Sequence, residues 1–199
     1  SYSGSTTKPT SITTPENRVV IGYINHNSGL LLSQQSITDV INNQQRTTSF
    51  SYNAAGQLMS IDGPRSDVND ITRFEYNAQG FKTKTTNALG YTTSVTAFNS
   101  FGQPITIVDE NSVATTLSYD LMGRVISSQR AGATEYFEYD LTGALIKSTL
   151  ANGNVIQYEY DAAGRLTAIQ DNAANRIEYQ LDAAGNQLST AINSSNGSL

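Results

Sequence analysis

The sequence contains no cysteine, no tryptophan and only one histidine among its 199 residues. Without cysteine, the chain cannot form disulfides, use a thiolate nucleophile or bind zinc through sulfur. A Ser-His-Asp triad could be built only around the single histidine, His26. The G-x-S-x-G nucleophile motif and the glycine-rich phosphate-binding motifs are also missing. These absences predict that the chain is not an enzyme and carries no cofactor and no metal.

Charged residues are scarce, at 15%, and the acidic excess of 17 over 12 gives a net charge of −5. This balance argues against nucleic acid and anionic membrane surfaces as partners. No apolar run approaches the roughly 18 residues of a membrane span, so we predict no membrane insertion. The N-terminal stretch SYSGSTTKPTSITTPENR has no apolar segment of the signal-peptide kind. Because the sequence does not begin with Met, we expect it to be a piece of a longer chain.

The sequence does contain many strand-forming residues. Hydrophobic residues make up only 38%, but they include 11 tyrosines and 6 phenylalanines, and Thr, Ile and Val are frequent. Aromatic and β-branched residues favour strands. The net charge is too small to keep such a chain unfolded. The composition therefore predicts a β-rich folded protein.

An internal repeat organises most of the chain. Seven glycines, from Gly56 to Gly185, recur at spacings of 24, 22, 21, 20, 21 and 21 residues. Four residues before each glycine stands an aromatic residue or leucine, and Asn or Asp follows it directly. These repeat turns are Tyr52, Asn53 and Gly56; Tyr76, Asn77 and Gly80; Phe98, Asn99 and Gly102; Tyr119, Asp120 and Gly123; Tyr139, Asp140 and Gly143; Tyr160, Asp161 and Gly164; and Leu181, Asp182 and Gly185.

The repeated unit has the pattern of a strand that ends in a tight turn. Apolar and polar residues alternate before the turn, as in Tyr158, Glu159 and Tyr160. Asn and Asp hydrogen-bond their own backbone two residues on, and glycine tolerates positive φ. The chain then returns through segments such as RLTAIQ, residues 165–170. Each repeat is therefore predicted to be a β-hairpin.

Two features of the repeat are less regular. An eighth, degenerate copy is predicted at residues 24–33, with Ile24 in the aromatic position, Asn25 in the Asx position and Gly29 in the turn. The returning strands do not alternate cleanly, since Leu166 and Ile169 are three residues apart, which indicates a β-bulge.

Three chemical interpretations compete with a structural one. Periodic aspartates can bind calcium, but three of seven copies carry Asn, which suits a turn and lacks the ligand charge. His26 is expected to be a solvated turn residue, and the pair Asp109–Glu110 to lie in a loop. Exposed rows of tyrosine could stack on sugars, although cross-strand packing explains the same pattern. Arg124 and Arg165 are interpreted as surface or cross-strand partners.

The repeats resemble a known family. SYDLMGRV (118–125), EYDLTGAL (138–145) and EYDAAGRL (159–166) closely resemble the YD repeat of Rhs proteins, and the resemblance extends over residues 21–190. It implies a strip of β-hairpins wound into a hollow shell. Such shells enclose a C-terminal toxin in bacterial Rhs proteins and insecticidal toxin-complex components, and related shells occur at cell surfaces in teneurins. The sequence has no D-P-x-G-L motif and ends in NSSNGSL, so the resemblance assigns no self-cleavage residue.

These observations predict an all-β fold of repeated antiparallel hairpins in a curved, spiralling sheet, part of a YD-repeat shell. The predicted regions are a polar, partly flexible segment at residues 1–20, about eight hairpins at 21–190, and a polar tail at 191–199. The predicted function is a non-enzymatic shell segment of a larger Rhs-type protein that encapsulates or presents a C-terminal toxin. Its partners would be the rest of that polypeptide and the toxin, and its location secreted, cell-surface or injected. The alternative is a surface module that binds glycans or a partner protein. Exposed edge strands would favour self-association.

Overall fold

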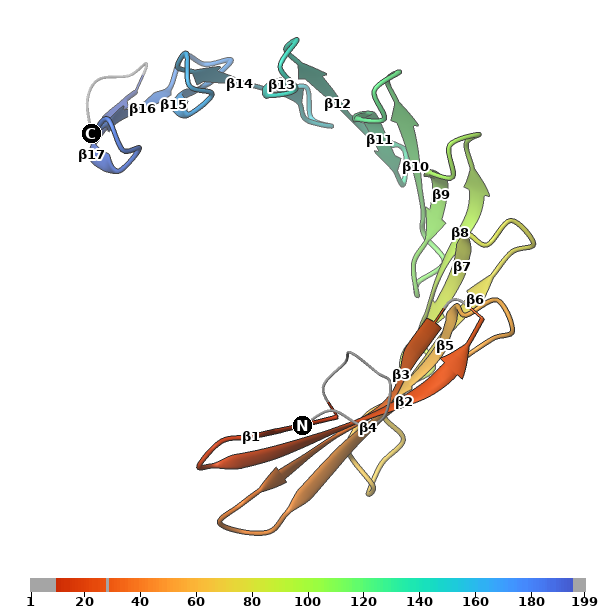
Figure 1. The fold of residues 1–199 in the computed structure, drawn as a ribbon. Helices are drawn as coiled ribbons and strands as arrows, with labels where there is room; N and C mark the ends of the chain where they lie inside the picture. The colour runs from red at the N-terminus through yellow and green to blue at the C-terminus, as the bar shows by residue number, and fades with distance from the viewer. Residues whose placement is uncertain (1–9, 28, 195–199) are drawn as a thin grey trace. The chain divides into compact units, whose positions relative to one another are not determined.

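The computed structural model describes residues 10–27 and 29–194, and every regular element in these residues is a β-strand (Figure 1). Seventeen strands follow one another along the chain, and every register that joins two of them is antiparallel, as in β14 with β15. The all-β prediction is confirmed. The outer parts of the two predicted polar segments, residues 1–9 and 195–199, lie outside the described residues.

The chain forms two compact units, residues 1–96 with 108–112, and residues 97–107 with 113–199. The first eight strands are β1 (Ser11–Thr13), β2 (Asn17–His26), β3 (Gly29–Asp39), β4 (Gln45–Tyr52), β5 (Leu58–Asp62), β6 (Ile71–Tyr76), β7 (Lys82–Thr86) and β8 (Thr92–Phe98). The others are β9 (Pro104–Val108), β10 (Ala114–Tyr119), β11 (Val125–Arg130), β12 (Ala133–Tyr139), β13 (Leu145–Thr149), β14 (Val155–Tyr160), β15 (Leu166–Asp171), β16 (Arg176–Leu181) and β17 (Gln187–Asn193).

The repeat motif joins the two strands of each hairpin. In the β14–β15 hairpin, Tyr158 pairs with Ile169 and Tyr160 pairs with Leu166. The register shifts between Glu159 and Tyr160, which leaves Thr167 as an extra residue in the returning strand. Equivalent shifts precede the aromatic residue in β4, β6, β10 and β12, and precede Leu181 in β16. This bulge explains why Leu166 and Ile169, three residues apart, lie on the same face.

The opposite ends of the strands use a related turn, which was not among the predicted features. Asn87 accepts hydrogen bonds from the backbone N–H groups of Leu89 and Tyr91, and Gly90 has a φ of 87°. Asp171 makes the same turn, in which Ala174 adopts a φ of 63° in place of glycine. The N-A-L-G stretch at residues 87–90 carried the signal for these turns.

The sheet extends beyond the predicted boundaries at both ends. Strand β1 and the first part of β2 lie before residue 21, and Ser11 pairs with Val20. Strand β17 continues past residue 190, and its Asn193 pairs with Arg176. Strand pairing uses backbone groups, so polar side chains do not prevent these segments from joining the sheet.

The prediction for the degenerate eighth copy was wrong in register. The shift that precedes the aromatic residue in other hairpins lies here between Gly22 and Tyr23, and Tyr23 pairs with Leu32. Tyr23, not Ile24, therefore occupies the aromatic position. Beyond it the strands continue to pair as far as His26 with Gly29, so Asn25 lies inside strand β2 and not in an Asx turn.

The two faces of the sheet differ in polarity. In β14, Ile156, Tyr158 and Tyr160 are half-buried on one face, while Gln157 and Glu159 are exposed on the other. Cross-strand ion pairs lie on the polar face, with 2.7 Å between Lys147 Nζ and Glu138 Oε1. Only Ala168, Ser36 and Ser148 are buried among the described residues. With so small a core, stability depends mainly on contacts between neighbouring strands and hairpins.

Candidate functional site: the turn rim and the tyrosine ladder

Each repeat turn is closed by the side chain of its Asn or Asp. Asp161 Oδ1 accepts the backbone N–H groups of Ala163 at 2.9 Å and Arg165 at 3.0 Å. Asn53 does the same with Ala55 and Gln57, both at 3.0 Å. All seven copies share this geometry, through Asn53, Asn77, Asn99, Asp120, Asp140, Asp161 and Asp182. The seven motif glycines all have φ between 75° and 97°. The Asx residue therefore turns the chain, and an amide serves as well as a carboxylate.

In four of the seven motifs, the residue after the glycine donates a hydrogen bond to a backbone carbonyl of the next turn, and we call these contacts turn links. Arg165 donates to the carbonyl of Asp182 at 2.9 Å, and Arg124 donates to that of Asp140 at 3.1 Å. Gln57 and Gln103 reach the carbonyls of Gly80 and Gly123 at 2.9 and 2.8 Å. Each of the two arginines also forms an ion pair of 2.7 Å with the aspartate of its own turn. Turn links thus join consecutive hairpins along one rim.

The motif tyrosines form a second connection between hairpins, here called the tyrosine ladder. Tyr160 donates its hydroxyl hydrogen to the carbonyl of Leu145 at 2.9 Å, in the returning strand of the preceding hairpin. The same bond, at 2.7 to 2.8 Å, runs from Tyr52 to Leu32, Tyr76 to Leu58, Tyr119 to Pro104 and Tyr139 to Val125. Except for Leu32, every acceptor stands two residues after the motif glycine of the preceding hairpin. The ladder therefore fixes the packing of one hairpin on another.

Burial favours the protonated form of three of the ladder hydroxyls. Burial raises the pKa of Tyr52, Tyr119 and Tyr160 above the ordinary value. A protonated hydroxyl is the form that donates to a carbonyl. The guanidinium of Arg124 lies 4.7 Å from the ring centre of Tyr139, which brings a turn link and the ladder into contact.

Comparison with known proteins agrees with this geometry. The family model described as "Teneurin YD-shell" matches residues 5–196. The chain belongs to the teneurin YD-shell family. Among solved structures, it is similar to "TcdB2-TccC3-Cdc42", with 17% identity and a TM-score of 0.69 over 89% of this chain. It is also similar to the Photorhabdus luminescens Tc holotoxin pore, with 17% identity and a TM-score of 0.67 over 89% of this chain.

The match covers most of this chain but only a small part of each similar structure. The chain covers 10% of the polypeptide in each of these two structures. At 17% identity the likeness shows the fold, which is a YD-shell sheet. No curated protein matches the sequence at a significant level. The resemblance inferred from the repeats is therefore confirmed at the level of family and fold.

His26 does not behave as the solvated turn residue expected from the sequence. It ends strand β2, and its Nε2 lies 2.9 Å from the carbonyl oxygen of Ala54 in the next turn. A Cβ atom placed on Gly56 would lie 2.8 Å from the imidazole ring, so this glycine makes room for the histidine. His26 therefore plays the part of a turn link in the first hairpin of this YD-shell sheet. The register that places it there depends on the longer β2–β3 pairing.

The carboxylates do not come together at a reactive centre. Asp109 accepts the backbone N–H of Asn111 within its own turn, and the motif aspartates are occupied in the same way. Within residues 10–27 and 29–194, no group of three or more His, Cys, Asp or Glu residues could hold a metal ion. The same residues contain no helix long and apolar enough to cross a membrane.

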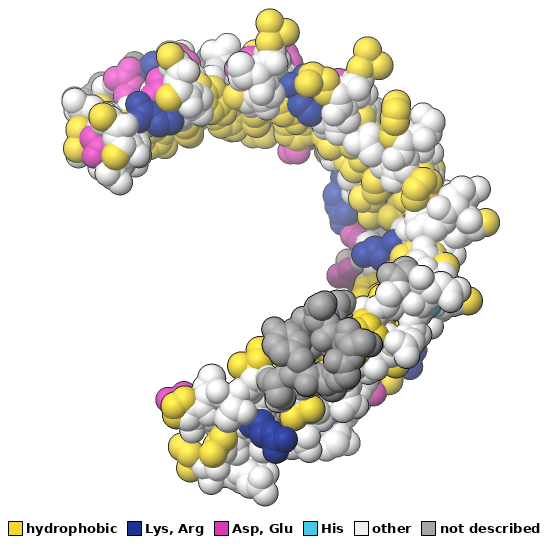
Figure 2. All heavy atoms as spheres, in the orientation of Figure 1, with side chains coloured by type: hydrophobic (Ala, Val, Ile, Leu, Met, Phe, Trp, Pro, Cys, Tyr) yellow, Lys and Arg dark blue, Asp and Glu magenta, His cyan; other side chains and the backbone are white. Residues whose placement is uncertain are grey.

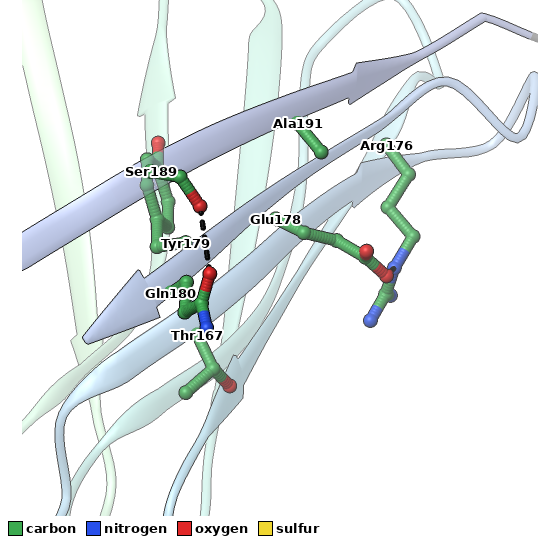
Figure 3. A pocket seen from close by; sticks show the side chains of 7 residues that line it. All are labelled: Thr167, Arg176, Glu178, Tyr179, Gln180, Ser189 and Ala191. Atoms are coloured by element: carbon green, nitrogen blue, oxygen red, sulfur yellow. Dashed lines mark hydrogen bonds and ion pairs between the residues drawn. The ribbon is translucent and has the colours of Figure 1, made fainter. Parts of the chain in front are cut away.

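A shallow groove of about 400 Å³ lies on the polar face of β15, β16 and β17 (Figure 3). Its lining includes Thr167, Gln180 and Ser189, and Ser189 donates a hydrogen bond to Gln180. Arg176 is held by both oxygens of Glu159, at 2.6 and 2.8 Å, and by Glu178 at 2.7 Å. The charge of the guanidinium is thus balanced by two carboxylates at the surface of the sheet.

The glycan alternative expects rows of exposed tyrosine rings. The five ladder tyrosines are half-buried, and their hydroxyls are already bound to backbone carbonyls. Tyr136, which is 53% exposed, lies outside the motif. The geometry of this sheet therefore favours packing over sugar stacking.

Acid should weaken the turn rim. Backbone N–H groups of Arg124 and Arg165 lower the pKa of Asp120 and Asp161, and the side chains of Thr142 and Asn186 lower the pKa of Asp140 and Asp182. A lowered folded-state pKa adds stability above the unfolded value of about 3.9, and this stability is lost as pH falls through the folded pKa. We expect the urea midpoint to fall between about pH 6 and about pH 3. A variant with Asn at all four positions is the control and should show a smaller change; an equal change would contradict this origin.

The ladder can be extended by mutation. Leu181 occupies the aromatic position of the last motif and pairs with Gln187 across the same bulge as Tyr160. Leu181→Tyr should place a hydroxyl near the carbonyl of Leu166 and add about 1 kcal/mol to the free energy of unfolding. Leu181→Phe, which supplies the ring without the hydroxyl, is the matched control. Urea melts in which the Tyr and Phe variants have the same midpoint would show that no ladder bond forms.

Proposed function

We propose that this chain is a non-enzymatic wall segment of a YD-repeat shell in a larger Rhs-type polypeptide. This proposal rests on one observation: the polar side chains of the motif form hydrogen bonds within the turns and between neighbouring turns and hairpins of the same sheet. Asx oxygens close the turns, turn links such as Arg165 to Asp182 join neighbouring turns, and the ladder hydroxyls join neighbouring hairpins. Groups used in this way are not available for catalysis or for binding a cofactor.

The larger function we propose is that the complete shell encloses or presents a C-terminal toxin. Support comes from the similar structures, one of which is described as a Tc holotoxin pore and another as TcdB2-TccC3 without its hypervariable C-terminal region. Both are much longer than this chain, which covers 10% of each. The partners of the segment would then be the rest of its own polypeptide and the toxin. Its location would be secreted, cell-surface or injected into a target cell.

The first test is the mass of the native polypeptide. Antibodies raised against this chain should recover from producing cells a protein several times heavier than 21.4 kDa. A native mass near 21.4 kDa would contradict the proposal. In the heavy protein, limited proteolysis should leave a C-terminal segment intact until the shell is opened with urea. A C-terminal segment that is digested first would argue against enclosure.

A further inference from the structure

Three consecutive repeat turns of the second unit carry large apolar side chains at their tips. Phe101, Leu121, Met122 and Leu141 are 81%, 101%, 73% and 101% exposed. We call these four residues the apolar ridge. The other four repeat turns hold alanine at both tip positions, apart from one glutamine. Hydrophobic side chains project from the turns beside strands β10 to β13 in Figure 2.

The carboxylates of the ridge turns already have partners within their own turns. Asp120 is paired with Arg124 at 2.7 Å, and Asp140 accepts the hydroxyl and backbone N–H of Thr142 and the N–H of Ala144. The charged groups that lie below the apolar tips are therefore already paired with groups of the same turn. Covering the ridge would not leave a buried charge without a partner.

The ridge is uneven along its length. Neighbouring tips are two strands apart, which corresponds to roughly 10 Å. Between the first two tips lies a notch of about 290 Å³, lined by Phe101, Gln103, Leu121, Met122 and Gly123. The third tip has Leu141 beside the smaller Thr142 and forms a single projecting knob. The ridge thus has a notch at one end and a knob at the other.

We propose that the apolar ridge is a self-association surface whose partner is the ridge of a second copy of this chain. A two-fold axis perpendicular to the ridge would place the knob of each copy, Leu141, in the notch of the other. Such an interface is self-complementary, because each copy offers the same two features in opposite order. The axis would pass close to the middle tip, so that Leu121 of one copy faces its own counterpart. This inference depends on the fold and not on the proposed toxin enclosure.

The available area supports a second copy as the occupant. Four exposed apolar side chains offer on the order of 600 Å² in total, at the upper limit of the patches found on monomeric proteins. Two ridges together would then bury roughly 1,200 Å², which is the lower end of specific protein interfaces. Interfaces at this small end of the range include many weak, transient ones, so we expect a dimer that dissociates on dilution.

Sedimentation of the chain over a range of concentrations tests the proposal. The parent should form dimers, and the double variant Leu121→Ser/Leu141→Ser should self-associate at least about a hundredfold more weakly. Leu89→Ser is the matched control, because Leu89 is a 79% exposed leucine in the Asn87–Gly90 turn of the first unit and is not part of the ridge. It should dimerise like the parent. A parent that stays monomeric at high concentration would overturn the proposal. So would a double variant that still dimerises, since association would then occur elsewhere, such as at a strand edge.

A cross-linking experiment tests the geometry itself. Because the chain has no cysteine, a single introduced thiol can react only with the same thiol of another copy. Under mild oxidation, Leu121→Cys should yield disulfide-linked dimers rapidly, whereas Leu89→Cys should do so only at the rate of random collision. Equal rates for the two variants would overturn the two-fold arrangement.

Discussion

Gly164→Val should lower the free energy of unfolding by about 2 kcal/mol, because valine would be held at positive φ. Gly164 has a φ of 75°, and no atom lies within 4 Å of the position that a Cβ would take. The loss would therefore come from backbone strain and not from a steric clash. The glycine also donates its N–H to the carbonyl of Asp161 at 2.9 Å, so the backbone cannot move to relieve that strain without opening the turn.

Two variants separate backbone strain from other effects of the change. Gly164→Asn should cost less than half as much, because asparagine tolerates positive φ far better than valine. Ala162→Val adds the same side chain two residues earlier, at a position without positive φ, and should leave the urea midpoint nearly unchanged. A Gly164→Val protein as stable as the parent would contradict the turn assignment.

Ala168→Leu should also destabilise the chain, by about 2 kcal/mol, because this position has no room for a larger side chain. Ala168 is 1% exposed and pairs with Glu159 on one side and Glu178 on the other. Arg176 binds both glutamates, so its guanidinium bridges strands β14 and β16 across β15. A leucine at position 168 would push against this bridge.

The controls use neighbouring positions of the same sheet. Ser189→Leu changes the equivalent position of the next hairpin, which is exposed, and should alter stability by no more than about 0.5 kcal/mol. In the background of Arg176→Ala, the cost of Ala168→Leu should shrink, since the two side chains are coupled. Urea melts that give the same cost with and without Arg176 would show that the bridge does not enclose this alanine.

The sequence was sufficient to predict the hairpins and their turns. The spacing of Tyr160, Asp161 and Gly164 depends on local backbone preferences, and these act within one hairpin. The bulge at Thr167 was visible only as a break in alternation. Its position had to come from the structure, because the pairing register depends on both strands together.

The contacts between hairpins could not be predicted in the same way. The tyrosine ladder joins residues such as Tyr160 and Leu145, which belong to different hairpins and are brought together by the pairing of strand β13 with strand β14. A signal for the turn links was present, because Gln or Arg follows the glycine in four of seven motifs. The sequence alone indicates only surface or cross-strand partners for these side chains, since the carbonyl of the next turn is not apparent from one repeat. His26 was misjudged for the same reason, as its partner, Ala54, lies in another hairpin.

The measurement that tests the central claim most directly is a urea-unfolding series in which ladder tyrosines are replaced by phenylalanine. Tyr76→Phe, Tyr139→Phe and Tyr160→Phe each remove one hydroxyl that donates to a carbonyl of the preceding hairpin. Each should lose about 1 kcal/mol. Tyr136→Phe, at a 53% exposed position outside the ladder, should lose almost nothing. If the three ladder variants unfold at the same urea concentration as Tyr136→Phe, the motif does not hold one hairpin to the next, and this account of the wall is wrong.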